Sequence, residues 1–60
     1  MNVREFVLTR LERKACRREE LAEVLGQEQE SRLDKTLSTL ERQGKIRKRS
    51  DGCLEFLRMR

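Results

Sequence analysis

The chain has 60 residues, of which 43% are charged and 35% hydrophobic, and its only aromatic residues are two phenylalanines. A domain of this length buries only about 60% of the surface that its unfolded chain exposes, so we expect one small core and one domain over residues 1–60. The sequence has no apolar run long enough for a membrane span or a signal peptide. We therefore expect a cytoplasmic protein.

The residues that most enzymes use are scarce. The chain has no histidine, which is the commonest general base, and Ser31, Ser38 and Ser50 each lack the partner that activates a nucleophile. Cys16 and Cys53 lie far apart, with no further Cys or His at metal-ligand spacing. We expect no enzyme activity, no metal site, no cofactor and no small-molecule ligand.

Charge is distributed unevenly along the chain, whose net charge is +4. Residues 1–30 carry six cations and seven anions, whereas residues 31–60 carry nine cations and four anions. Because a positively charged surface attracts polyanions, the second half is the expected contact surface for a nucleic acid.

A first helix is predicted from Asn2 to about Lys14. Asn2 and Glu5 form a capping-box pattern at its start. Its apolar residues recur at helical spacing at positions Val3, Phe6, Val7 and Leu11.

A second, shorter helix is predicted from about Arg18 to Gly26. Glu19 and Glu20 lie in its first turn, where the helix dipole favours anions. Gly26 is expected to end this helix in the left-handed conformation. The apolar residues that mark the helix are Leu21, Val24 and Leu25.

A third helix is predicted to follow directly and to end at Gly44. Ser31 and Asp34 offer a reciprocal cap at its start. Its apolar residues form one narrow stripe of Leu33, Leu37 and Leu40.

After the third helix the apolar period changes to that of a hairpin around residues 50–52. A three-residue loop, in which a type I turn is followed by glycine, would pair Ile46 with Phe56. A two-residue loop would slip the register by one, pair Ile46 with Leu57 and exchange the faces of the strand. We expect the three-residue loop because it places Ile46, Leu54 and Phe56 together under the helices.

This register leaves a second apolar row on the other face of the hairpin. The row consists of Cys53, Leu57 and Met59. An apolar row on so small a domain indicates a contact with a protein partner or with a second copy of the chain.

Two stretches resemble a known family, namely "EELAEVLG" at residues 19–26 and "RLDKTLSTLERQGKI" at residues 32–46. They are similar to the second and third helices of the winged helix-turn-helix superfamily, and the order of elements matches that superfamily over nearly the whole chain. The resemblance implies an α+β fold. Three helices would be followed by a C-terminal β-hairpin wing in a small two- or three-stranded sheet.

The resemblance also implies a short strand before the second helix. In such proteins the segment that corresponds to residues 15–17 pairs with the last strand of the hairpin, which would bring Cys16 near Cys53. Reduced thiols and a disulfide both remain open, and reduced thiols are the expected state in a cytoplasmic protein.

The third helix has two rows of positions that are free of acids, whereas Asp34 and Glu41 share another side. In this superfamily the helix enters the major groove, where Arg and Lys bind guanine or phosphate, Gln binds adenine and Thr contacts the thymine methyl group. The alternative is an exposed polar face that binds nothing. The two rows are Arg32, Thr36, Thr39 and Gln43, and Ser31, Lys35, Ser38 and Arg42.

The stretch from Arg42 to Arg49 holds five cations and no anion. Such charges can protect a strand edge from aggregation or lie along phosphates as a wing. We favour the wing because a protective edge tolerates either sign of charge. The residues expected to bind DNA are Arg18, Ser31, Arg32, Lys35, Thr36, Thr39, Gln43, Arg47, Lys48 and Arg49.

The predicted function is binding of double-stranded DNA by a small transcriptional or replication regulator, acting alone or as a homodimer. The alternative is a winged-helix protein-interaction module. The chain also resembles the FeoC-type accessory proteins of ferrous iron transport through its "DGC" after the third helix. It lacks their cysteine cluster, so their metal role does not carry over. Single-stranded nucleic acid is disfavoured because no Tyr or Trp offers a stacking platform.

Overall fold

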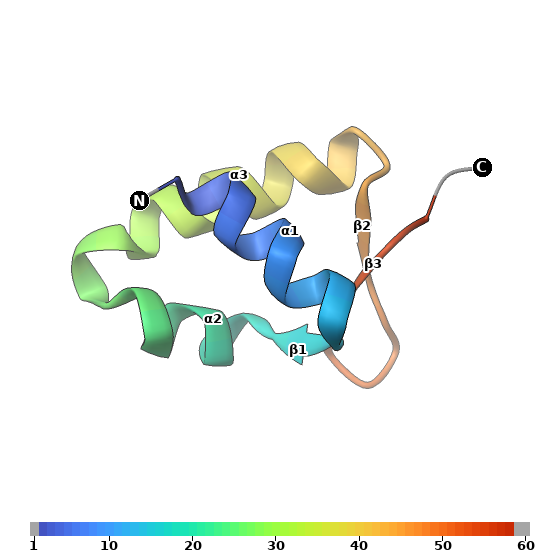
Figure 1. The fold of residues 1–60 in the computed structure, drawn as a ribbon, viewed down its shortest axis with the longest axis horizontal. Coiled ribbons are helices and arrows are strands. Elements are labelled where there is room, and N and C mark those ends of the chain that lie inside the picture. Colours follow the sequence, from blue (N-terminus) through green and yellow to red (C-terminus); the bar gives the residue numbers. More distant parts are fainter. Residues whose placement is uncertain (1, 59–60) are drawn as a thin grey trace.

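The computed structural model describes residues 2–58. These residues form an α+β, winged-helix-like arrangement of three helices and a small three-stranded antiparallel sheet (Figure 1). Within them, no helix has the length and apolar character needed to cross a membrane. The elements in chain order are α1 (Val3–Arg13), β1 (Cys16–Arg17), α2 (Arg18–Leu25), the 3-10 turn η1 (Gln27–Gln29), α3 (Glu30–Arg42), β2 (Ile46–Lys48) and β3 (Cys53–Phe56).

The predicted cap of α1 is confirmed. The Asn2 side-chain oxygen accepts the N–H of Glu5 at 3.3 Å, which satisfies one of the backbone donors that every helix start leaves unpaired. The helix ends at Arg13, because Lys14 is extended.

The second helix begins at Arg18 and is ended by Gly26 at positive φ, as predicted. Gly26 has φ 91° and ψ 162°, so φ is positive while ψ lies far from the roughly +47° of the left-handed helix. Val24, one of the apolar residues that mark the helix, is 53% exposed. The core contacts α2 through other side chains, namely Leu21, Ala22 and Leu25.

The predicted cap of the third helix is also wrong. The turn η1 runs directly into α3, which begins at Glu30 with Gln29 as a cap that makes no side-chain hydrogen bond. Ser31 therefore lies inside the first turn, and Asp34 binds Arg18 instead.

The end of α3 follows the glycine prediction. Gly44 has φ 75° and donates its N–H to the carbonyl of Glu41, while the N–H of Lys45 reaches the carbonyl of Leu40 at 2.9 Å. This pair of bonds is the Schellman arrangement, which needs a residue that tolerates positive φ.

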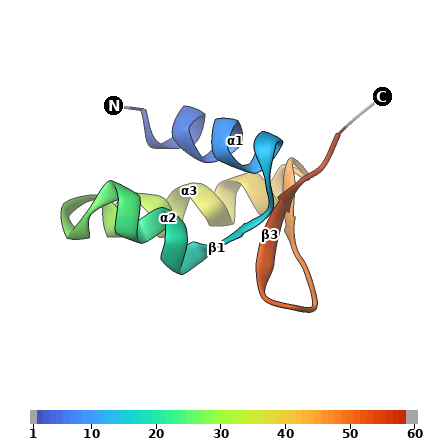
Figure 2. The same ribbon diagram turned by 60° about the horizontal axis from the view of Figure 1, so that its bottom comes forward.

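The hairpin has the predicted register. Ile46 pairs with Phe56 and Arg47 with Glu55, and the N–H of Gly52 donates to the carbonyl of Arg49 at 3.0 Å to close the three-residue loop. The strand expected before α2 is confirmed as well, since β1 pairs with β3 and gives the sheet order β1-β3-β2. Figure 2 shows the hairpin loop extending away from the helices.

The core lies where α1 and α3 meet the inner face of the sheet. Val7, Leu33 and Leu40 have no exposed surface, and Ile46 is 1% exposed. Each such side chain contributes about 1.5–3 kcal/mol relative to leaving it in water. The core therefore fixes which side of α3 faces outward. Its buried members are Val3, Val7, Leu11, Cys16, Leu21, Leu33, Leu37, Leu40, Ile46 and Leu54.

Candidate nucleic-acid interface

The side of α3 opposite the core carries most of the predicted DNA-binding residues. Thr36 is half-buried, whereas the other predicted residues are exposed, namely Ser31, Arg32, Lys35 and Thr39 on the helix and Gln43 just after its end. Their exposure follows from the burial of the leucine stripe on the other side of the helix. Across the described residues, neither Arg32 nor Lys35 forms an ion pair.

The hairpin places Arg47, Lys48 and Arg49 in solvent, but their charges are balanced differently. Arg47 binds Glu55 on the neighbouring strand at 2.7 Å, and Arg49 lies 3.6 Å from Asp51. Lys48 makes no ion pair with any residue between 2 and 58. Exposed pairs of this kind contribute about 0–1 kcal/mol, so a phosphate can replace the carboxylate at either arginine.

Arg18, also predicted to bind DNA, is turned toward α3. Its Nε donates to Asp34 at 2.6 Å, and one terminal nitrogen donates to both Asp34 and Glu30. These hydrogen bonds raise the pKa of Arg18 and lower the pKa of Asp34 below its ordinary value. The ion pairs join the start of α2 to the start of α3, so the positive charge of Arg18 is paired with acids of the protein itself.

A hollow of about 280 Å³ separates α3 from the hairpin. Its walls carry three acids, Glu19, Asp34 and Glu41, against two cations. We call this the wing side of α3. It is lined by Arg18, Glu19, Asp34, Leu37, Ser38, Glu41, Lys48, Gly52 and Leu54.

The other side of α3 faces the start of α1. A shallow hollow of about 560 Å³ lies between the two helices, and no acid lines it. We call this the α1 side. It is lined by Asn2, Val3, Arg4, Arg32, Lys35 and Thr36.

Arg4 is a member of this surface that the sequence prediction missed. It is exposed on the first turn of α1 and lies far in sequence from Arg32. Only the packing of α1 across α3 brings them to one hollow. The sequence places Arg4 two residues after the cap residue Asn2, in the first turn of a helix, but it does not say which helix lies beside it.

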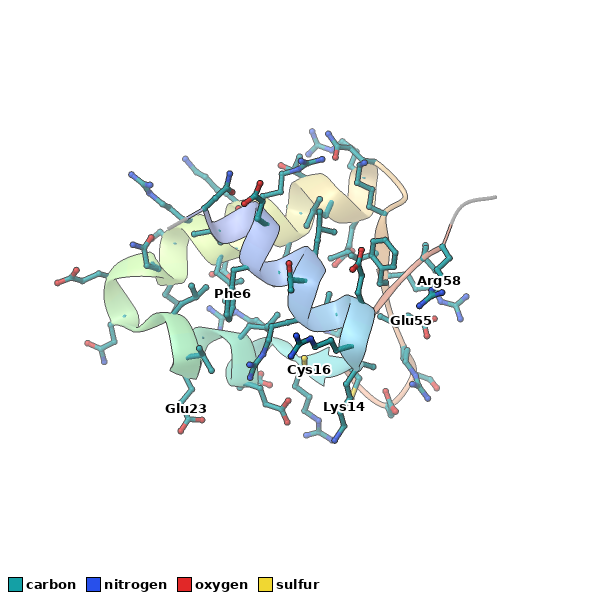
Figure 3. The ribbon with its side chains drawn as sticks, viewed as in Figure 1. Phe6, Lys14, Cys16, Glu23, Glu55 and Arg58 are labelled. Carbon is teal, nitrogen blue, oxygen red and sulfur yellow. The ribbon has the colours of Figure 1, made fainter. Side chains whose placement is uncertain are left out.

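The two cysteines are free thiols. Cys16 pairs with Leu54 across the sheet, whereas Cys53 pairs with Arg17. Because Leu54 and Cys53 are consecutive in one strand, the two thiols point to opposite faces. Burial is the largest cause that raises the pKa of the Cys16 thiol, and this thiol lies 3.4 Å from the carbonyl oxygen of Lys14. Figure 3 shows the Cys16 and Lys14 side chains near the end of α1.

The expected apolar row on the hairpin is interrupted. Glu55, paired with Arg47, lies between Cys53 and Leu57 along the chain, and Met59 is outside the described residues. Leu57 instead lines a hollow of about 610 Å³ beyond the end of β3, where Arg58 is seen in Figure 3. The lining residues of this C-terminal hollow are Leu8, Glu12, Lys45, Phe56, Leu57 and Arg58.

A scan against protein-family models, a search of curated proteins and a search of solved structures each return no match to the chain. Between residues 2 and 58, no group of three or more Cys, Asp or Glu side chains is placed to hold a metal ion. The function of this surface is therefore inferred from its charges and its shape.

Proposed function

We propose that the chain is a winged helix-turn-helix protein that binds double-stranded DNA, as a small regulator of transcription or replication. The observation that carries this proposal is the outer face of α3, which exposes Arg32 and Lys35 without an acidic partner among the described residues. An α-helix fits the major groove, which is about 12 Å wide.

In this proposal each part of the surface has its own role. Arg32 and Lys35 bind phosphate or guanine edges, and Thr39 and Gln43 lie further along the same helix toward the bases. Lys48 contacts phosphate from the hairpin, while Arg47 does so after leaving Glu55. Most of the affinity is electrostatic, so it falls as salt rises.

The test is binding of a fluorescent duplex to the double variant Arg32→Gln with Lys35→Gln. Removing two phosphate contacts is expected to weaken binding by at least tenfold at low salt, because each contact contributes a salt-dependent term of about 0.9 in the logarithmic slope. Fluorescence anisotropy with duplex and with single-stranded DNA of equal length measures the effect, and the duplex is expected to bind more tightly.

The matched control is the double variant Arg10→Gln with Arg13→Gln. Both arginines lie with Glu5 along a different hollow, on the side of α1 away from α3, and the net charge changes by the same amount. If this control loses as much affinity as the α3 variant, only net charge matters and the proposed interface is wrong.

A second candidate function is self-association through the C-terminal hollow. Leu8, Phe56 and Leu57 give this hollow an apolar base, while Glu12 and Lys45 place opposite charges on it. A two-fold copy could pair these charges reciprocally. Leu57→Lys is then expected to abolish a concentration-dependent dimer in sedimentation without changing the affinity of the monomer for DNA.

A further inference from the structure

Beyond the faces just assigned, the α1 side of α3 concentrates positive charge from two separate helices. Arg4 comes from the first turn of α1, and Arg32 and Lys35 come from the first half of α3. In both views the start of α1 lies at the end of the molecule opposite the hairpin loop (Figures 1 and 2). The cluster is therefore separate from the cations of the hairpin.

None of these three cations forms an ion pair within residues 2–58. Glu5, the acid nearest to Arg4 in sequence, lines a different hollow, and Asp34 and Glu41 line the wing side. Three like charges around one hollow repel each other unless an anion lies between them. An anion is thus the ligand that the hollow favours.

The hollow also offers neutral hydrogen-bond donors. Thr36, a half-buried residue, lines the hollow, and Asn2 stands at the N-terminal end of α1, whose dipole attracts negative charge. The Asn2 oxygen is already used by the N–H of Glu5, so its amide group remains as a donor. Cations with a hydroxyl and an amide form a donor set suited to phosphate oxygens.

We infer that this hollow, formed by Arg4, Arg32, Lys35 and Thr36, binds neighbouring backbone phosphates of the duplex, one at each of its three cations. The inference rests on the proposed function. The major groove is bordered by phosphates on both sides, and the α1 side and the hairpin flank α3 on opposite sides. In this arrangement the hollow contacts the phosphates on one side of the groove, and Lys48 contacts those on the other side. Arg4 is then a residue that contacts DNA.

The test is the salt dependence of duplex binding by Arg4→Gln. Loss of one phosphate contact is expected to reduce the slope of log affinity against log salt by about 0.9, equally for every duplex sequence. Arg4→Lys is expected to keep the slope, because it keeps the charge. The control is Arg13→Gln, on the side of α1 away from α3, which is expected to leave the slope unchanged.

A second readout does not depend on DNA. Inorganic phosphate titrated into the labelled protein is expected to shift the amide resonances of Asn2, Arg4 and Thr36 in a saturable manner, and Arg4→Gln is expected to remove that response. An unchanged slope for Arg4→Gln overturns the inference, as does a phosphate response equally strong around Arg13. If the native protein binds no duplex but phosphate saturates the hollow, the anion site stands and the proposed function fails.

Discussion

On the α1 side of α3, Arg32 and Lys35 meet a third cation, Arg4, around a hollow that no acid lines. On the wing side, Asp34 and Glu41 lie on the same helix, and Asp34 is bound to Arg18. One helix thus separates a surface that attracts anions from a surface whose charges are largely balanced within the protein.

This comparison shows that a count of cations does not identify a binding surface. The stretch from Arg42 to Arg49 is the most basic in the sequence, yet Arg47 and Arg49 have acidic neighbours in the folded chain. Arg4 is isolated in the sequence and gains two basic neighbours only when the helices pack. Whether a cationic side chain is free to bind an anion therefore depends on its neighbours in the folded chain.

The largest expected effect comes from truncating a buried core side chain of α3, because this packing holds both sides of the helix in position. Leu40 has no exposed surface, so Leu40→Ala is expected to cost about 2–5 kcal/mol in the free energy of unfolding. A chain of this length has only roughly 3–9 kcal/mol in total, so the variant is expected to lose a large part of its stability. Circular dichroism during urea unfolding measures the loss.

The matched control for that prediction is Val24→Ala, also an apolar position on a helix. Because Val24 is 53% exposed, the expected change is within about 0.5 kcal/mol. Equal destabilisation by the two variants would mean that α3 does not pack as described.

The wing side can be made to resemble the α1 side by removing an acid. Glu41→Gln is expected to tighten duplex binding about two- to fivefold at low salt, because an exposed charge interaction is worth up to about 1 kcal/mol. Glu23→Gln is the control, since Glu23 projects from α2 away from α3 and the hairpin (Figure 3). Fluorescence anisotropy should separate the two variants, and an equal gain in both would show an effect of net charge alone.

The Arg18–Asp34 pair predicts a smaller, pH-dependent effect. Hydrogen bonds from Arg18 lower the pKa of Asp34 in the folded chain, so this carboxylate stabilises the fold above its unfolded pKa of about 3.9. That contribution is lost as the pH falls through the lower, folded pKa. The Tm of the native protein should therefore decrease more steeply below about pH 4 than that of Asp34→Asn.

Asp51 supplies an internal comparison in the same titration. The N–H of Cys53 lowers the pKa of Asp51, so part of the acid dependence should persist in Asp34→Asn. Identical pH profiles for the native protein and Asp34→Asn would contradict the role given to the Arg18–Asp34 pair.

The smallest effect concerns the two thiols of the sheet. Cys16 is 8% exposed, and its raised pKa keeps it protonated at neutral pH, whereas Cys53 is half-buried. Alkylation followed by mass spectrometry should modify Cys53 first and Cys16 only on unfolding. An intramolecular disulfide formed under mild oxidation would contradict the strand register, which directs the thiols to opposite faces.

Local signals in the sequence were sufficient for the three helices and the hairpin register, whereas β1 was implied only by the family resemblance. Asn2 acts through its side chain on the adjacent helix start, and Gly44 and Gly52 act through their own backbone geometry. The apolar periods of the helices and the hairpin identify most of the core. The cap assigned to Ser31 failed because η1 runs into α3 and moves the helix start two residues earlier, with Gln29 at the cap position. Tertiary packing overrode a local pattern there.

The candidate site was less predictable because its charges interact across elements. Arg18 binds two acids that are distant in the sequence, and Arg4 reaches Arg32 only through the crossing of α1 and α3. Val24 has an apolar side chain at a helical position, yet no neighbouring element covers it. Such contacts depend on the angles between helices, which a single sequence does not specify.

The most direct test of the account is the affinity of the native protein for a random-sequence duplex across a salt series. Phosphate contacts by Arg4, Arg32, Lys35, Arg47 and Lys48 predict a slope of log affinity against log salt of about −4.5, at about −0.9 for each contact. A slope close to zero, or no binding even at low salt, would contradict the central claim that α3 and its flanks form a DNA-binding surface.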